Sequence, residues 1–357
     1  MVGMQLEGTV LWGRDLDAIE GRLHIERGLI VDFEQTHVDG ADIIMPAFVN
    51  GHTHLGDSIA KEAGAGVPLK ELVAPPDGLK HQLLQAAAPE TIIRAIRGSL
   101  QVMIDSGTTA AIEFREGGVD GVEQLLAAQA GLPIEVQIMG RSSEAALARA
   151  DGFGASSVRD EDYADVRAAA AAAGKPFGIH AGERDPDDID GALALDPDFL
   201  VHMGHAEPRH LRAVADADIP IVVCPRSNLI TGVGMPPVAD LHAATTVGLG
   251  TDNVMMNAPS MLRELEFAAK LTDLDARTLL QMATVHPAEI GGFDAGVLAV
   301  DAAARLVVFD GASPNLRYSK DIHRTIVQRA TAADITQTLT AMQGEGFEPT
   351  DSYESGS

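Results

Sequence analysis

The sequence has a single cysteine, six lysines, one tryptophan and no apolar run of membrane-spanning length. One cysteine excludes an intramolecular disulfide and a thiolate-rich metal site, so any metal ion must be held by histidine and carboxylate side chains. A membrane span needs roughly 18 consecutive apolar residues. The start of the chain, MVGMQLEGTVLWGRD, lacks a basic segment followed by an apolar one, so no secretory signal is predicted. A soluble, cytoplasmic protein is the expectation.

Basic side chains are scarce. The chain has 26 lysines and arginines and 52 aspartates and glutamates, which gives a formal net charge of −26. A surface of this sign repels phosphate backbones and anionic lipids, which argues against nucleic acid or membrane as a partner. Repulsion of this size also destabilises a compact chain in dilute salt. The composition therefore favours a halophilic protein, adapted to a cytoplasm of high salt.

The thermal stability should accordingly depend on salt. The screening length grows from about 3 Å at 1 M salt to about 30 Å at 0.01 M, so the acidic groups repel one another over a much longer range in dilute buffer. We expect the melting temperature, followed by circular dichroism, to fall on transfer from molar salt to dilute buffer. An unchanged melting curve would contradict the adaptation.

A chain of 357 residues suits one large α/β barrel of roughly 250 residues plus a smaller companion domain. The first forty-odd residues alternate short apolar runs with turn signals, as strands do. From about Pro46 the pattern becomes strand, loop and helix in repetition. IIMPAFVNGHTH is the first predicted barrel strand, and seven more follow at 108–114, 133–139, 152–158, 175–181, 198–203, 219–224 and 245–252. The clearest helical patterns between them cover 90–107, 160–175 and 259–271.

Eight strand–helix units fit a closed (β/α)8 TIM-type barrel better than an open sheet. Strand-like text returns after about residue 295, in GVLAVDAAARLVVFDG and HRTIVQRATAADI. The predicted organisation is a small β-sandwich domain built from both chain ends, with the barrel inserted between them. The predicted segments are 1–46 and 296–343 for the small domain, 47–295 for the barrel and 344–357 for a disordered tail.

His52 and His54 stand one residue apart at the end of the first predicted barrel strand. Residues i and i+2 of a strand point to the same side, so both face the barrel axis at the end where such barrels carry their active sites. One HxH pair is a weak signal, since two polar loop residues would look the same. Other strand ends strengthen it: the fifth brings His180, the sixth His202 and the eighth Asp252. His52, His54, His180 and Asp252 make a sensible four-ligand set for a divalent ion.

The stretches GHTHL, HAGE, VHMGH, CPRSNL and GLGTDN, in this order, resemble the amidohydrolase superfamily, specifically its mononuclear deaminase-like branch. That branch contains enzymes that deaminate S-adenosylhomocysteine, 5′-deoxyadenosine, guanine or cytosine, and the triazine hydrolases. The resemblance covers nearly the whole chain. Dinuclear members need a carboxylated lysine or a glutamate on the fourth strand, and GFGASSV has neither. The resemblance thus implies one divalent ion per chain, with zinc favoured and iron or manganese as alternatives.

The resemblance also implies roles for single residues. Asp252 would be both a metal ligand and the acceptor of a proton from the metal-bound water, which attacks as hydroxide. Glu183 would protonate the ring nitrogen of the substrate. His202 would orient and polarise the hydroxide, with His205 as the less favoured claimant for that role.

Basic residues gather at the predicted mouth of the barrel. Lys61, Lys70 and Lys80 fall within the loop after the first strand, and three arginines follow the second, third and seventh strands. Such a group suggests an anionic substrate, while ordinary pairing with nearby acids explains it equally well. The candidate substrate-binding residues are Arg115, Arg141, Arg226, Ser227, Asn228, Lys80 and His81.

The leading expectation is a metal-dependent hydrolytic deaminase of an amino-substituted nitrogen heterocycle, such as a nucleobase, nucleoside or pterin-like compound. A hydrolase of cyclic amides, or of another C–N or C–X bond, would use almost the same residues. A non-catalytic metal-binding relic is the alternative of another class. The partner is a small-molecule substrate in the first two cases, and a homo-oligomer is left open.

Overall fold

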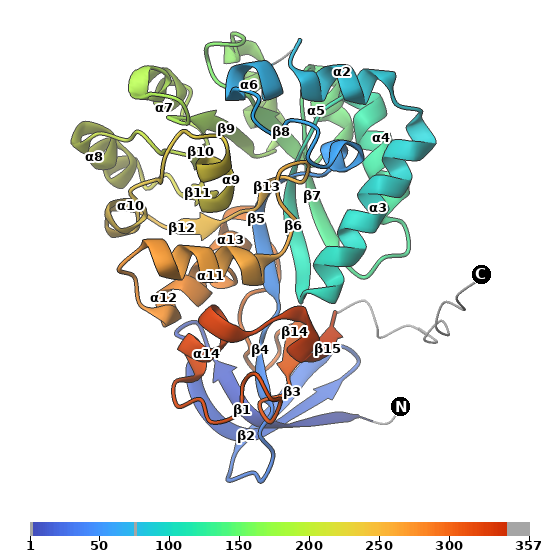
Figure 1. Cartoon of the computed structure of the whole chain (residues 1–357), viewed down its shortest axis with the longest axis vertical. Helices are drawn as coiled ribbons and strands as arrows, with labels where there is room; N and C mark the ends of the chain where they lie inside the picture. The colour runs from blue at the N-terminus through green and yellow to red at the C-terminus, as the bar shows by residue number, and fades with distance from the viewer. Residues whose placement is uncertain (1–2, 75–76, 341–357) are drawn as a thin grey trace.

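A computed structural model describes residues 3–74 and 77–340 of the chain. Figure 1 shows a barrel surrounded by helices, with a small sheet against one of its ends. The tail predicted over 344–357 and the last residues of the preceding segment, 341–343, lie outside the described residues. Within those residues, no helix has the length and apolar character needed to cross a bilayer.

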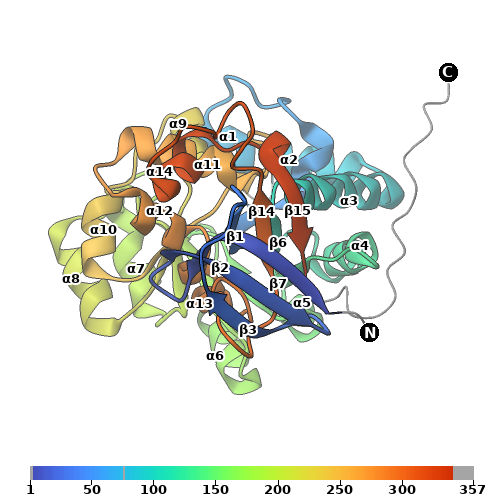
Figure 2. The ribbon, with the colours of Figure 1, turned by 90° about the horizontal axis from the view of Figure 1, so that it is seen from below.

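The small sheet joins the two ends of the chain. Its six strands lie in the order β15-β14-β4-β1-β2-β3, and neighbours run antiparallel except for the parallel pair β1 and β4. Val10, Leu23, Ile30, Ile44 and Leu306 are buried together in its core. Figure 2, seen from below, shows the sheet across the bottom of the barrel. The strands are β1 (Met4–Trp12), β2 (Asp17–Glu26), β3 (Leu29–Gln35), β4 (Ile43–Pro46), β14 (Leu306–Phe309) and β15 (Ile335–Leu339).

The large sheet is parallel throughout, in the order β12-β11-β10-β9-β8-β7-β6-β5-β13. The eighth predicted strand is split in two: β12 pairs with β11, and β13 pairs with β5, the first strand of the barrel. The sheet therefore closes on itself, and the predicted fold class, a TIM-type barrel with a small β domain from both chain ends, is confirmed. Its strands are β5 (Phe48–His54), β6 (Thr108–Arg115), β7 (Glu135–Gly140), β8 (Gly152–Ala155), β9 (Phe177–Ala181), β10 (Phe199–His202), β11 (Ile221–Val223), β12 (Val247–Leu249) and β13 (Asp252–Asn253).

Helices cover the outside of the barrel because each buries one apolar stripe against the strands. In α3, for example, Ile92, Ile96, Leu100 and Met103 recur at helical spacing and are all buried. The helices are α3 (Pro89–Asp105), α4 (Gly118–Gln129), α5 (Glu144–Arg149), α6 (Ala164–Ala173), α7 (Ile189–Ala194), α8 (Pro208–Ala217), α9 (Pro225–Ile230), α10 (Val238–Ala244), α11 (Met261–Leu271), α12 (Ala276–Met282) and α13 (Val285–Gly291).

The segment after β5 covers the end of the barrel that lies away from the small sheet (Figure 1). It consists of the 3-10 turn η1 (Leu55–Ala60), α1 (Leu69–Val73) and α2 (Leu79–Ala86). Leu69 and Leu72 are the buried residues of α1, and Lys80 is the buried residue of α2. This segment places side chains over the carboxyl ends of the barrel strands.

The strand-like interpretation of HRTIVQRATAADI is wrong for most of its length. The stretch forms α14 (Ile322–Arg329) and the turn η3 (Ala332–Asp334) before β15 begins. Asp321 caps the helix by accepting a hydrogen bond from the backbone N–H of Arg324 at 3.0 Å. Ile326 and Val327 are buried, and the helix packs against α11 and α12. Tertiary packing therefore overrides the strand propensity of its β-branched residues.

Candidate metal and active site

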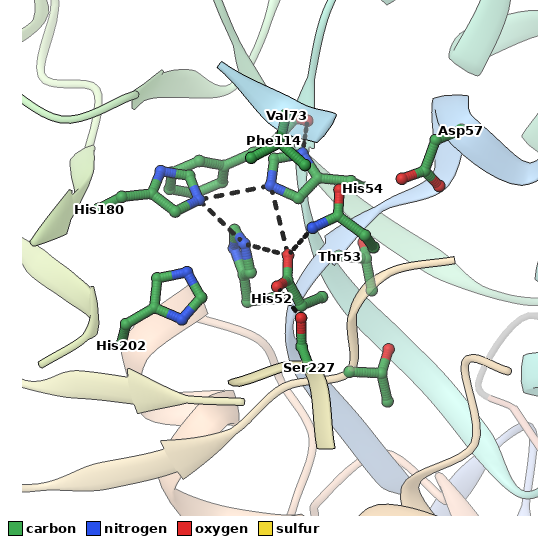
Figure 3. Close-up of polar contacts among 12 residues, drawn as sticks. His52, Thr53, His54, Asp57, Val73, Phe114, His180, His202 and Ser227 are labelled. Atoms are coloured by element: carbon green, nitrogen blue, oxygen red, sulfur yellow. Dashed lines mark hydrogen bonds and ion pairs between the residues drawn. The ribbon is translucent and has the colours of Figure 1, made fainter. Parts of the chain in front are cut away.

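Three imidazoles converge at the mouth of the barrel (Figure 3). His52 and His54 lie on β5 and point to the same side, and His180 lies on β9. The Nε2 atom of His180 is 3.2 Å from Nε2 of His52 and 3.4 Å from Nε2 of His54. Because His180 is 126 and 128 residues away along the chain, only closure of the barrel brings these side chains together.

The hydrogen bonds of these rings show that the group suits a cation. Nδ1 of His54 is 3.0 Å from the Phe114 carbonyl oxygen, and Nδ1 of His180 is 2.8 Å from the Ala155 carbonyl oxygen. A carbonyl only accepts hydrogen bonds, so both Nδ1 atoms carry the proton and both Nε2 atoms present lone pairs. Burial lowers the pKa of His54 to about 3, and the ring is neutral at pH 7. Lone pairs facing one another at 3.4 Å repel, and a divalent ion between them would remove the repulsion.

Asp252 completes this group from β13. Its Oδ1 atom lies 3.5 Å from Nε2 of His52 and 3.6 Å from Nε2 of His54. Ser227 donates a hydrogen bond to its Oδ2, and Asn253 donates to its Oδ1 at 2.8 Å. Burial alone would raise the pKa of Asp252, but its hydrogen-bonding contact with His52 and the other neighbouring histidines hold that pKa well below the ordinary value. Asp252 is therefore ionised, as a metal ligand must be.

Glu183, His202 and Asp252 form a second group whose donor atoms all lie within 4.8 Å of one another. Oε2 of Glu183 is 3.7 Å from Nε2 of His202. Nδ1 of His202 accepts a hydrogen bond from the side-chain amide of Asn228 at 3.3 Å, so the ring proton sits on Nε2 and faces Glu183. Burial raises the pKa of Glu183, which favours its protonated form. His205 belongs to neither group of ligand-type side chains.

Two residues of this centre have left-handed backbone conformations that non-glycine residues seldom adopt. His202 has φ of 77° and Asp252 has φ of 59°. Such conformations cost roughly 1–3 kcal/mol each and persist only where the surroundings enforce them. His202 ends β10 and Asp252 begins β13, so both unusual conformations occur where a barrel strand reaches the metal-ligand candidates.

The arginines predicted at the mouth differ in their surroundings. Arg115 donates from Nε to the Gly121 carbonyl at 2.9 Å and from Nη2 to Gln124 at 2.8 Å. Arg226 binds Glu264 through both its backbone N–H and its side chain. Of the three arginines, only Arg141 lines the pocket beside the imidazoles.

Two adjoining cavities open above the centre. The inner pocket, of about 90 Å³, is lined by His54, His180, Glu183, His202, Asp252 and Lys80 among others. The outer cavity, of about 750 Å³, includes His81, Leu84 and Tyr163 in its wall. Arg141, Ser156 and Asp160 line both. Ser227 and Asn228 instead donate hydrogen bonds, Ser227 to Asp252 and Asn228 to His202.

Sequence reasoning missed the residues that support the ligands. Glu116 follows β6 and places its Oε1 2.7 Å from Nδ1 of His54. Asn253 follows Asp252 and holds it, as described above. Glu113, on β6, accepts hydrogen bonds from the backbone N–H of Leu55 at 2.8 and 2.9 Å. The only available signal was the pair of acids in IEFRE, and nothing in that stretch identifies their partners.

Glu113 provides a pH-dependent test of this support. The Thr53 hydroxyl, between the two histidines of β5, has one hydrogen but lies 3.0 Å from the Ile112 carbonyl and 2.6 Å from Glu113 Oε2. A protonated Glu113 would satisfy both contacts. Burial raises the pKa of Glu113 from 4.5 to about 8, in line with this geometry.

We therefore expect the stability of the wild type to fall relative to Glu113→Gln as pH rises from about 4.5 to about 8. The folded state binds the proton over this range and the unfolded state has lost it. The free energy of unfolding therefore falls as pH rises, by up to roughly 1.4 kcal/mol per pH unit. Below pH 4.5 the difference in free energy of unfolding between the two proteins should not change with pH. Urea unfolding at fixed molar salt measures it, with exposed Glu144→Gln as control. Parallel pH profiles for wild type and Glu113→Gln would show that Glu113 is ionised.

A closed barrel that gathers histidines and carboxylates at the carboxyl ends of its strands is the architecture of a metal-dependent hydrolase. A family model described as the amidohydrolase family matches residues 43–343. The chain belongs to this family. The expectation of a hydrolase that acts on carbon–nitrogen bonds is confirmed by this membership together with the deaminase relatives described next.

Relatives with the same span bear related names. A protein of Archaeoglobus fulgidus named as an aminohydrolase is 37% identical over 90% of this chain and 94% of its own length. One of Methanothermobacter thermautotrophicus, named in the same way, is 32% identical over 92% of this chain and 95% of its own length. The 5-methylthioadenosine/S-adenosylhomocysteine deaminase of Halobacterium salinarum is 26% identical over 85% of this chain and 81% of its own length.

Solved structures share the fold. An adenosine deaminase from Xanthomonas campestris with bound zinc superimposes with a TM-score of 0.79 at 20% identity, covering 94% of this chain and 91% of its own. An atrazine chlorohydrolase from Arthrobacter aurescens, complexed with zinc, gives 0.79 at 19% identity, covering 95% of this chain and 94% of its own.

Proposed function

We propose that this protein is a metal-dependent hydrolytic deaminase of an amino-substituted nitrogen heterocycle. The observation that carries the proposal is the position of Glu183. This carboxyl group, with its raised pKa, lies beside His202 and Asp252 in the pocket that His54 and His180 also line. Protonation of a ring nitrogen requires such an acid. The names of the relatives support the same reaction class.

His52, His54, His180 and Asp252 would hold the metal ion, since their ligand atoms converge, the Nε2 atoms of His54 and His180 present lone pairs, and Asp252 is an ionised carboxylate. When bound, a divalent ion lowers the pKa of a water molecule from 15.7 towards about 7 and so supplies hydroxide at neutral pH. Zinc is the ion we propose, because three imidazoles and one carboxylate suit it and two structural neighbours carry zinc.

The remaining steps are proton transfers by the chain's own groups. Asp252 Oδ1 faces the imidazoles and can accept a proton from the attacking water. Glu183 donates its proton to the ring nitrogen, which makes the amino-bearing carbon more electrophilic. Deamination then requires a second proton on the departing amine, and Asp252 can pass on the one that it accepted. The added hydroxyl loses its proton as the C=O bond forms and the C–N bond breaks, and this proton returns to the ionised Glu183. Nε2 of His202, which carries its proton, stabilises the oxygen that adds to the ring.

A panel that separates leaving groups tests this proposal against hydrolysis of a cyclic amide. Aminated purines, pyrimidines and pterins are compared with cyclic amides such as dihydropyrimidines, in molar salt with zinc present. The deaminase releases ammonia from one class of aminated heterocycle and opens no ring. Ring opening without ammonia would overturn the deaminase assignment in favour of the cyclic-amide hydrolase, and metal binding without any turnover would favour the non-catalytic relic.

A further inference from the structure

Lys80 is buried to an unusual degree for its residue type. All six lysines lie within the described part of the chain, and Lys80 alone is buried, with 2% of its surface exposed. It belongs to α2, in the segment that covers the barrel mouth, and lines the inner pocket. A buried ammonium group is stable only where partners take up its hydrogens.

Lys80 contacts Glu116, which in turn contacts the metal-ligand candidate His54. Its Nζ lies 2.5 Å from Oε1 of Glu116, and the same oxygen is 2.7 Å from Nδ1 of His54. Glu116 is 4% exposed, and Arg141 also reaches its Oε1, at 3.2 Å. A carboxylate behind an imidazole ligand fixes the orientation of the ring and raises its basicity. The position of Lys80 therefore bears on the orientation of His54.

Lys80 also contacts Asn253, which in turn contacts the ligand candidate Asp252 on a different strand. Lys80 Nζ donates to Oδ1 of Asn253 at 3.0 Å, which leaves the amide hydrogens of Asn253 to face Asp252. Those hydrogens reach Oδ1 of Asp252, the oxygen that faces His52 and His54, at 2.8 Å. One ammonium group thus stands two contacts away from His54 on one side and from Asp252 on the other.

We propose that Lys80 is a positioning residue that couples the segment over the pocket to two metal ligands. The position of this segment over the pocket places the ammonium group between Glu116 and Asn253. That placement sets the direction of the His54 ring and of the Asp252 carboxylate together. The proposal rests on the proposed function in that His54 and Asp252 must be ligands.

Electrostatics separates this role from that of a substrate-binding cation. A positive charge near a cation weakens cation binding, so removing it should raise metal affinity if charge were its only contribution. A group that orients ligands acts in the opposite sense, because outer partners of metal ligands typically contribute about 10–100-fold in metal affinity or activity. The sign of the change in zinc affinity therefore identifies the role.

The test compares Lys80→Met with Lys70→Met in zinc titrations of metal-free protein against a competing chelator. Lys70 is exposed, lies in the same segment and lines the same pocket. Lys80→Met should bind zinc about 10–100-fold more weakly, and Lys70→Met should bind it as the wild type does. With any substrate of the panel, at saturating zinc, kcat of Lys80→Met should fall while KM stays within about threefold, a span of under 1 kcal/mol.

Asn253→Ala supplies a second variant that leaves the contact between Lys80 and Glu116 intact. It should also weaken zinc binding, and the double variant should lose less than the product of the two single losses, because the residues act through one chain of contacts. Unchanged or tighter zinc binding by folded Lys80→Met would overturn the proposal, as would a rise in KM alone. If Lys80→Met does not fold, Lys80→Arg takes its place in the double variant. Losses of zinc affinity that are additive between Asn253→Ala and Lys80→Arg would then overturn the proposal. If the wild type binds no zinc, the proposed function is overturned as well.

Discussion

Replacing Glu183 with glutamine is expected to lower kcat by roughly 10²–10⁴-fold while leaving the metal content near that of the wild type. The amide has nearly the shape of the protonated carboxyl group, so the pocket and the contact with His202 should persist. It cannot deliver a proton to a ring nitrogen. Glu183 is not one of the four proposed metal ligands. The substitution should therefore lower turnover and leave the metal stoichiometry unchanged.

The matched control is Glu144→Gln, the same chemical change at an exposed position on α5. It should keep full activity. Turnover is followed by ammonia release and metal content by elemental analysis of the same sample. Full activity of Glu183→Gln would remove this residue from the mechanism, and loss of metal from it would make it a ligand or a support of one.

His180→Ala is expected to lose metal and activity together. His180 is the ring that contacts both others, at 3.2 and 3.4 Å between Nε2 atoms. Without it, the site loses one of its four proposed ligands, the imidazole that lies between the other two, so it should bind the ion much more weakly. Zinc content should drop from about one ion per chain to well below that level, and ammonia release should drop in proportion.

Thermal unfolding gives a reading of this loss that does not depend on a substrate. An ion that binds only the folded state stabilises it, so a chelator should lower the melting temperature of the wild type and leave His180→Ala unaffected. His37→Ala is the control, because its side chain is 81% exposed. Wild-type zinc content in His180→Ala would show that the three imidazoles are not the metal site.

The barrel and its ligand candidates could be predicted because each signal is local. Strands with a histidine at or next to their carboxyl end occur at 48–54, 177–181 and 199–202, Asp252 follows the apolar strand 247–249, and closure of the barrel brings these ends together. The split of the last strand into β12 and β13 was not predicted. β12 ends at Leu249 and β13 begins at Asp252, whose left-handed φ no pattern in GLGTDN reveals.

The supporting contacts could not be predicted, because their partners lie far apart along the chain. Lys80 and Asn253 are separated by 173 residues, and Thr53 and Glu113 by 60. Their sequence positions alone place all the basic residues at the mouth in one group. The structure separates them, since Lys80 and Arg141 line the inner pocket and Arg115 and Arg226 do not.

The most direct test of the account is ammonia release from aminated heterocycles by one purified sample in molar salt, assayed as isolated, after chelation and after return of zinc. We predict about one zinc ion per chain, ammonia from a single compound class, loss of that activity on chelation and its recovery with zinc. Ammonia release that survives removal of the metal, or a protein that binds no divalent ion at all, would contradict the assignment of His52, His54, His180 and Asp252 as the centre of a metal-dependent deaminase.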